Sequence, residues 1–279
     1  MASNVKKTTV QDDLQVSPRV EAMLAKEAKR ITTLRIVYLV GAIAVLIYSA
    51  RVSDIDLVEL AEGGGTMAEY VGRYFPPDFS DWRFYLEDIV ETVAMGIWGT
   101  LLAAVVASPL AVLASENLCP QFIVQPVRRL MDTMRAINEV VFALIFVVAV
   151  GLGPFAGVLA LFVHTTGTLG KLFSEAIENI EVGPIEGVRA SGASKFQEIL
   201  FGVLPQVMPL WISFTLYRFE ANVRSASVLG IVGAGGIGVS LYQSFRSFKY
   251  PKVCAILIIL IIAVTLLDVL SAKLRKRVM

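Results

Sequence analysis

Long apolar runs alternate with polar segments along this chain, and the alternation predicts an all-α bundle of membrane-spanning helices. A helix needs about 20 apolar residues to cross the hydrocarbon core of a bilayer. The first run is short, but Arg35 and Arg51 at its ends can extend to the two interfaces. The four clearest runs are 36–50, 93–113, 207–230 and 253–271. The second carries small residues at helix-packing spacing, namely Gly96, Gly99, Ala103 and Ala107.

The middle of the chain is harder to divide into spans. Residues 140–170 include no Asp, Glu, Lys or Arg, a length too great for one untilted span and too small for two. The sequence Gly-Leu-Gly-Pro at 151–154 predicts a tight turn. We therefore expect one span from about 131 to 150 and another from 155 to about 172. The prediction is a polytopic protein with six transmembrane helices.

The distribution of positive charge predicts the orientation. Six spans place both termini on one side, and the segments assigned to that side contain fifteen Lys and Arg residues. The opposite side has four, which are Arg73, Arg83, Arg246 and Lys249. Cytoplasmic loops carry an excess of Lys and Arg. Both termini are therefore expected in the cytoplasm.

The spans divide the chain into segments. The first span is expected to be an uncleaved anchor, because about thirty polar residues precede it and no small-residue cleavage site follows. The segment 52–88 lies along the membrane surface or contacts a partner outside, two alternatives that stay open. The expected segments are a cytoplasmic N-terminal segment (1–33), the anchor (34–51), a periplasmic segment (52–88), the core (89–272) with a cytoplasmic loop at about 173–205, and a basic tail (273–279).

Composition agrees with a membrane protein and offers little for catalysis. Hydrophobic residues make up 56% and charged residues 18% of the chain, whereas about a quarter of an ordinary soluble domain is charged. The two cysteines, Cys119 and Cys254, and the single histidine, His164, form no metal-ligand spacing. We expect no metal site and no enzymatic activity. His164 is interpreted as a hydrogen-bonded packing residue, with pathway lining as the alternative.

Polar residues inside the expected spans are candidates for a translocation pathway. An Arg or Asp at the centre of a membrane helix costs about 2.5–3.5 kcal/mol. Such residues should face the bundle interior, a water-filled path or a dimer axis. Glu220 and Arg224 are four residues apart and can pair on one helix face. The candidates in the fifth span are Arg218, Glu220, Asn222, Arg224, Ser225 and Ser227, and near the inner mouth of the third span they are Arg135, Asn138 and Glu139.

These candidates leave alternatives open. Arg135, Asn138 and Glu139 either line an inner vestibule or form a helix–helix network that holds an inner gate. Arg224, with Arg218, is expected to lend positive potential to the pathway, and Asn222, Ser225 and Ser227 are expected to offer polar contacts. A guanidinium fork would suit an oxyanion if the pathway carries one.

The cytoplasmic loop has the pattern of a helical hairpin. Pro184 suits the first turn of a short helix, and Gly192 lies where that helix should end. Ser194 can cap a second, amphipathic helix that leads into the next span. Small residues around the turn would let another surface approach closely.

Glu186, then Gly192 six residues later, then Leu204-Pro205, resembles the loop that marks permease subunits of binding-protein-dependent ABC importers. The chain departs from that pattern at Gly187, Val188 and Gly202, where the family prefers Ala, Ala and Ile. The resemblance implies a type I importer permease and a coupling helix that docks on an ATPase subunit. The residues it assigns to coupling are Glu186, Gly187, Arg189, Ala190, Ser191, Gly192, Ala193 and Ser194.

Further segments resemble the phosphonate importer permease, namely 75–80, 125–130, 135–139, 222–226 and 233–238. This resemblance implies a permease homodimer in the inner membrane of a bacterial cell. The homodimer would work by alternating access with two ATPase subunits and a periplasmic phosphonate-binding protein. No nucleic acid partner is expected. The same machine could carry phosphite, a phosphate ester or another small solute. An ion-coupled secondary transporter is the alternative from another class.

Two observations concern nucleotides. The chain has no G-x-x-x-x-G-K-[ST] loop, so ATP and Mg are expected on a separate ATPase subunit, and no cofactor on this chain. Three glycines match G-x-G-x-x-G, but they follow a membrane span and no ribose-binding acid lies about twenty residues on. We interpret the segment as a turn between the last two spans and a candidate outer gate, formed by Gly233, Gly235, Gly236 and Gly238.

Overall fold

The computed structural model describes residues 18–55 and 62–278, and the chain falls into two units divided between Ala68 and Glu69. The first unit contains α1 (Pro18–Val52), a single 35-residue helix. Its segment from Leu34 to Val52 is apolar enough to span a membrane. The short helix α3 (Gly64–Gly72) crosses the division and buries none of its residues.

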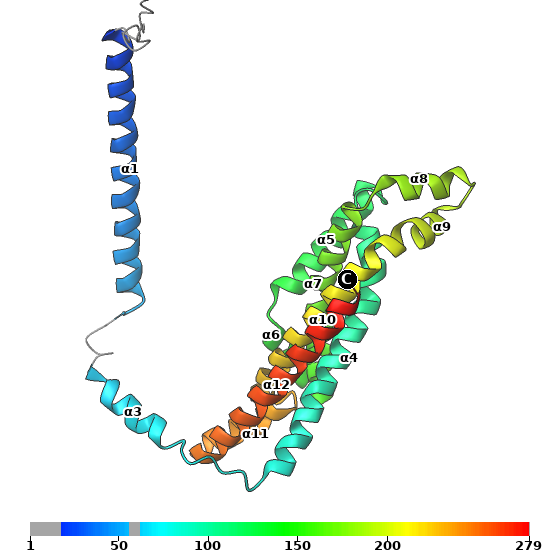
Figure 1. Ribbon diagram of the computed structural model, residues 1–279. Helices are drawn as coiled ribbons and strands as arrows, with labels where there is room; N and C mark the ends of the chain where they lie inside the picture. The colour runs from blue at the N-terminus through cyan, green and yellow to red at the C-terminus, as the bar shows by residue number, and fades with distance from the viewer. Residues whose placement is uncertain (1–17, 56–61, 279) are drawn as a thin grey trace, which may run out of the picture. The chain divides into compact units, whose positions relative to one another are not determined.

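The second unit is a bundle of helices (Figure 1). Its described residues contain no strand. The two ends of the bundle are named here for use below. The hairpin end is the one from which α8 projects, and the Trp82 end is the one where α4 begins. The helices are α4 (Trp82–Ala114), α5 (Gln121–Ala136), α6 (Glu139–Val150), α7 (Pro154–Glu178), α8 (Val182–Ala190), α9 (Lys195–Gln197), α10 (Leu204–Leu229), α11 (Ile237–Arg246) and α12 (Tyr250–Val278).

Five of the described helices are long and apolar enough to cross a membrane, and α5 with α6 forms a sixth candidate that bends by 87°. The expectation of six spans is thus confirmed, but the expectation of a continuous third span from about 131 was wrong. Asn138 explains the break, because its side chain accepts a hydrogen bond from the Val140 N–H at 2.9 Å and so starts a new helix.

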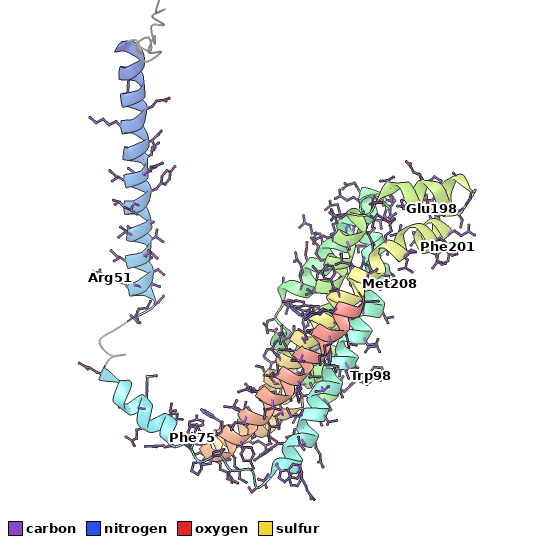
Figure 2. The ribbon with its side chains drawn as sticks, viewed as in Figure 1. Arg51, Phe75, Trp98, Glu198, Phe201 and Met208 are labelled. Atoms are coloured by element: carbon purple, nitrogen blue, oxygen red, sulfur yellow. The ribbon has the colours of Figure 1, made fainter. Side chains whose placement is uncertain are left out.

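Small residues bring α4, α7 and α10 close together, as their spacing predicts. A Cβ added to Gly99 would lie 2.8 Å from the Leu161 Cβ of α7, and one on Gly96 would lie 2.6 Å from Val223 of α10. Such close approach is the usual basis of helix packing in membranes. Bulky apolar side chains such as Trp98, which is 56% exposed, point outward from the bundle (Figure 2).

The segment 182–203, named the hairpin here, projects from the bundle (Figure 1). Helix α8 ends before Gly192, whose φ of +83° suits glycine. Ser194 and Gln197 then form a reciprocal capping box at the start of α9. One π-helical turn over Glu198–Val203 joins α9 to α10. The expected order of short helix, turn and second helix leading into a span is confirmed.

The glycine-rich segment between α10 and α11 is a turn, as expected. Gly233, Gly235 and Gly236 have φ values of +82°, +86° and +73°. Gly238 must be small for a different reason, since an added Cβ would lie 2.2 Å from the Ser227 carbonyl oxygen. The turn folds α11 back against α10 and α4 at the Trp82 end (Figure 1).

Candidate functional site

Two ion pairs join α10 to α12. Glu220 Oε1 lies 2.9 Å from a guanidinium nitrogen of Arg275, and Arg224 Nη1 lies 2.9 Å from Asp268 Oδ1. The pair that the spacing of Glu220 and Arg224 allows is therefore not the one formed, because α12 offers each residue an opposite charge of its own. The Arg224 and Asp268 side chains are 46% and 43% exposed, although they lie on long apolar helices. An exposed charge pair at such a position does not suit a lipid-facing surface.

A second polar cluster lies at the break between α5 and α6. Glu139, the first residue of α6, accepts a hydrogen bond from the Ser225 hydroxyl of α10 at 2.7 Å. His164 of α7 lies on the other side of the carboxylate, with Nε2 at 3.8 Å from Glu139 Oε2. The other ring nitrogen, Nδ1, lies 3.0 Å from the Ile137 carbonyl oxygen. The predicted hydrogen-bonded role of His164 is confirmed.

The tautomer of His164 follows from these contacts. A carbonyl oxygen only accepts, so Nδ1 carries the proton of this hydrogen bond. In a neutral ring, Nε2 would then direct a lone pair toward the Glu139 carboxylate.

Arg218 supplies the positive charge beside this cluster. It lies close enough to Glu139 for the two charges to interact. Its Nε is buried and has no hydrogen-bond partner among the described residues. A buried donor without a partner is costly unless something satisfies it. We name Glu139, His164, Arg218 and Ser225 the kink cluster.

The remaining pathway candidates have local partners. Arg135 binds Asp132 on its own helix at 2.8 and 3.0 Å, and Asn138 caps α6. Ser227 donates to the Arg224 carbonyl oxygen at 2.6 Å. These contacts explain the fold of each segment and leave the kink cluster as the place where ionisable side chains of three helices meet.

Asn222 links three helices in the interior. Its amide oxygen accepts from Thr165 of α7 at 2.9 Å, and its amide nitrogen donates to Thr100 of α4 at 2.8 Å. The residue is 1% exposed. Its position is that of a packing residue. The sequence grouped it with the pathway as a polar residue inside a span, and its partners, 57 and 122 positions away, had no local signal.

An ion pair braces the hairpin internally. Arg189 of α8 donates to both carboxylate oxygens of Glu198, each at 3.0 Å, and Lys195 binds the same carboxylate at 3.2 Å. These hydrogen bonds lower the pKa of Glu198 to about 2, so the carboxylate stays charged near neutral pH. Figure 2 shows Glu198 and Phe201 on this segment.

The tip of the hairpin offers a surface of small residues. A cavity of about 390 Å³ lies there, and Gly187 has open space around its Cα. Phe196 and Phe201, which are 72% and 62% exposed, flank the tip. Most residues assigned to coupling are exposed, namely Glu186, Gly187, Arg189, Ala190, Ser191, Gly192 and Ser194, whereas Ala193 is half-buried.

Arg128 ties three elements together near the hairpin end, and sequence reasoning missed it. It binds Glu116 at 2.8 Å, the Ala114 carbonyl oxygen at 2.9 Å, and Glu178 at the end of α7. In the sequence, Arg128 contributed only to the count of positive charges. Its partners come from segments up to 50 positions away, so no local pattern indicated them.

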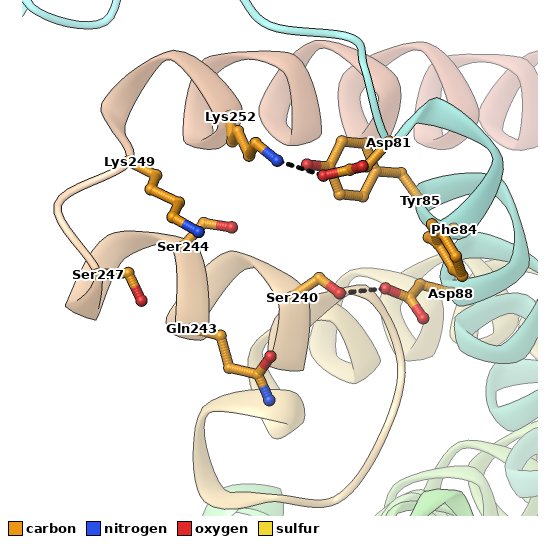
Figure 3. A pocket seen from close by; sticks show the side chains of 10 residues that line it. All are labelled: Asp81, Phe84, Tyr85, Asp88, Ser240, Gln243, Ser244, Ser247, Lys249 and Lys252. Carbon is orange, nitrogen blue, oxygen red and sulfur yellow. Dashed lines mark hydrogen bonds and ion pairs between the residues drawn. The ribbon is translucent and has the colours of Figure 1, made fainter.

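A polar cavity of about 460 Å³ opens at the Trp82 end (Figure 3). Ser240 donates to Asp88 across it, and Lys252 forms an ion pair with Asp81. None of these residues was a sequence candidate. The cavity is lined by Asp81, Phe84, Tyr85, Asp88, Ser240, Gln243, Ser244, Ser247, Lys249 and Lys252.

Side chains of α4 also cap the start of α11. Glu91 accepts from the Gly236 N–H at 2.7 Å, and the Thr92 hydroxyl accepts from the Ile237 N–H at 2.8 Å. These bonds fix the glycine turn against α4. Among the described residues, no group of three or more His, Cys, Asp or Glu side chains could hold a metal ion.

Comparison with known proteins identifies the family. Residues 107–279 match the family described as binding-protein-dependent transport system inner membrane component. The chain is 42% identical over 233 residues to the phosphite transport system permease protein PtxC of Stutzerimonas stutzeri, covering 83% of this chain and 85% of that protein. It is 63% identical over 118 residues to PhnE2 of Escherichia coli (strain K12), named as a cryptic phosphonate transport system permease, covering 42% of this chain and 97% of that protein.

The fold is also similar to that of a solved transporter chain. It matches a chain of the inward-facing MetNI methionine ABC transporter with a TM-score of 0.62 at 22% identity, covering 72% of this chain and 99% of that one. The expected importer permease fold is thereby confirmed. The family match spans more than half of the chain. This protein belongs to the binding-protein-dependent transport family and is the permease component of an ABC importer, a non-catalytic inner membrane subunit.

Proposed function

We propose that this permease carries phosphonates into the cell, as a homodimer that works with two ATPase subunits and a periplasmic phosphonate-binding protein. Both termini and the hairpin lie in the cytoplasm in this proposal, and residues 52–88 lie outside. The core 89–272 forms the pathway. ATP and Mg are used by the ATPase subunits, and this chain binds neither.

The names of the relatives support this cargo class. PtxC is named for phosphite and PhnE2 for phosphonate. Both ligands are small phosphorus oxyanions with tetrahedral geometry and negative charge. The high identity to PhnE2 extends over 118 residues, whereas the match to PtxC covers most of both chains. The relatives therefore support a small phosphorus oxyanion as cargo more strongly than they support phosphonate or phosphite in particular.

The kink cluster is the single structural observation that best supports passage of an anion. Arg218 has a buried Nε without a hydrogen-bond partner among the described residues, beside a carboxylate that already accepts from Ser225. An oxyanion in the pathway would satisfy the free donor, since guanidinium groups match phosphonate oxygens. Glu139 would keep the affinity for the oxyanion low, because its carboxylate competes with the oxyanion for the same arginine.

Arg224 is proposed as a second cationic position along the path. Its ion pair with Asp268 limits its attraction for an anion. Weak attraction suits conduction, because a pathway must release what it binds. High-affinity selection then belongs to the binding protein. Asn222 and Ser227 contribute through helix packing in this proposal.

Energy is proposed to enter through the hairpin. The exposed turn around Gly192 would fit against an ATPase subunit, and the Arg189–Glu198 ion pair would make the hairpin stiff enough to transmit movement. ATP binding would close the ATPase subunits and turn the bundle from inward-open to outward-open. Release of the hydrolysis products would reset it.

ATPase activity of the reconstituted complex tests the proposal. The complex contains this chain, the ATPase subunit and the binding protein, with and without 2-aminoethylphosphonate. We expect the loaded binding protein to stimulate hydrolysis, and Gly192→Arg to abolish the stimulation while the permease still inserts. Failure of the chain to associate with any ATPase subunit would reject the importer assembly.

Phosphite is the second candidate cargo, and the 42% identity to PtxC is the observation that favours it. The same assay separates the two. Stimulation by a phosphite-loaded binding protein, without stimulation by any phosphonate, would identify phosphite as the solute. The proposed assembly and its use of ATP would stand.

A further inference from the structure

The cavity at the Trp82 end has positive donors on one wall and carboxylates on the other (Figure 3). Lys249, Ser244 and Ser247 come from α11 and the turn that follows it, and Lys252 from the start of α12. Asp81 and Asp88 come from the other side, at the start of α4. The two walls are held together by the Lys252–Asp81 and Ser240–Asp88 contacts.

Several polar groups in this cavity have no partner for their side chains among the described residues. The Lys249 ammonium and the hydroxyls of Ser244 and Ser247 are free donors on the first wall. On the second wall, Asp88 uses Oδ2 for the Ser240 contact, which leaves Oδ1 available. The volume of about 460 Å³ is ample for a small solute.

We propose that this cavity receives a zwitterionic aminophosphonate before it enters the pathway, an inference that rests on the proposed function and narrows its substrate class. The phosphonate oxygens would accept from Lys249, Ser244 and Ser247. The ammonium group would face Asp88, with Asp81 adding negative potential on the same wall. A solute with both charges matches both walls at once, whereas a simple anion matches only one.

Binding in this cavity would be weak, so the solute would stay there only briefly. Lys249 is exposed, and exposed ion pairs contribute little, about 0.2–1 kcal/mol each, which corresponds to a factor of about five at most. A receiving site of that strength holds a solute handed over by a binding protein without retaining it.

Binding is tested first on the permease–ATPase complex without binding protein, by ³¹P line broadening of 2-aminoethylphosphonate and of methylphosphonate. Lys249→Gln should weaken binding of both about two- to fivefold. Asp88→Asn should weaken only 2-aminoethylphosphonate, because an asparagine oxygen still accepts from Ser240 and methylphosphonate has no ammonium group. Arg246→Gln is the matched loss of positive charge outside the cavity lining and should change neither.

Delivery kinetics provide the second readout. With 2-aminoethylphosphonate-loaded binding protein, Lys249→Gln and Asp88→Asn should lower the turnover number and leave the KM for the binding protein unchanged. A raised KM with unchanged turnover would make the cavity a protein docking site and overturn the inference. Equal effects of Lys249→Gln and Arg246→Gln, or equal effects of Asp88→Asn on both phosphonates, would also overturn it.

The two proposals can fail separately. If only phosphite-loaded binding protein stimulates the wild-type complex, the phosphonate cargo is rejected by that assay alone. If phosphonates are transported but the cavity variants behave like the wild type in both measurements, the cargo stands and the receiving site is rejected.

Discussion

Arg189 and Glu198 form a two-pronged ion pair across the hairpin, with Nε to Oε1 and Nη2 to Oε2 both at 3.0 Å. The two residues lie on opposite arms, before and after the turn at Gly192. The Glu198 side chain is 7% exposed, whereas that of Arg189 is 57% exposed. The pair therefore fixes the angle between the arms while it leaves the tip open to a partner.

Loss of this brace should weaken coupling. Arg189→Gln leaves the Glu198 carboxylate with Lys195 as its one remaining ion-pair partner among the described residues. We expect stimulated ATPase activity to fall about two- to fivefold, since a single exposed lysine holds the carboxylate less firmly than the two-pronged arginine does. Lys195→Gln, at a position 79% exposed, should have a smaller effect. Equal stimulation in the wild type and Arg189→Gln would show that the brace has no role in coupling.

Arg218 should be required for transport through its charge. Arg218→Gln removes the donor whose Nε is free, and a hydrogen bond to a charged group contributes about 1.5–3 kcal/mol. We expect the transport turnover number to fall about tenfold or more. Arg218→Lys should retain some of the rate, because it keeps the charge and loses the fork.

Arg73→Gln is the control for this experiment, because Arg73 is an exposed cation that pairs with Glu69 on α3. It should transport at the wild-type rate. Membrane yield is measured for all three variants. A normal rate in Arg218→Gln at normal yield would exclude an electrostatic role in the pathway.

Variants of the Arg224–Asp268 pair test whether the attraction of Arg224 for the solute is limited by Asp268. Arg224→Gln should lower uptake about two- to fivefold. Asp268→Asn removes the ion-pair partner of Arg224, so the arginine should hold the solute more tightly. Turnover should then also fall, and the permease–ATPase complex should be half-saturated at a lower solute concentration. Identical changes in both variants would instead mean that the pair only holds α10 against α12.

The hydrogen bonds of Asn222 should stabilise the bundle. Thr100→Val removes the acceptor of the Asn222 amide, and interhelical hydrogen bonds in membranes contribute about 0.6–1.7 kcal/mol. Thr215→Val is the matched control, since among the described residues the Thr215 hydroxyl donates only to the Trp211 carbonyl oxygen of its own helix. Thermal unfolding in detergent should distinguish the two. Equal midpoints would contradict the packing role.

Much of the fold could be predicted from local pattern. Charge-free runs indicate the spans because a charged side chain facing lipid is costly. Ser194 and Gly192 marked the hairpin, since capping and positive φ depend on neighbouring residues alone. Asn138, followed by a charged residue and an apolar run, was also a capping signal. It was overlooked because the apolar count favoured one continuous span.

The partners of the charged residues could not be predicted in the same way. Arg224 meets Asp268 and Glu220 meets Arg275 because α10 and α12 pack at one particular rotation and depth. That register depends on tertiary packing, which the spacing within α10 does not encode. The cavity at the Trp82 end joins α4 to α11 and α12, segments about 150 positions apart, and had no local signal at all.

Uptake into proteoliposomes tests the central claim most directly. The vesicles contain this chain with its ATPase subunit, ATP inside and binding protein outside, and the solute is labelled 2-aminoethylphosphonate. The account predicts uptake that requires both ATP and the binding protein and is lost in Gly192→Arg. Uptake driven by an ion gradient without ATP would contradict it. The account would also fail if the complex hydrolyses ATP in response to a binding protein loaded with another solute but takes up no phosphonate.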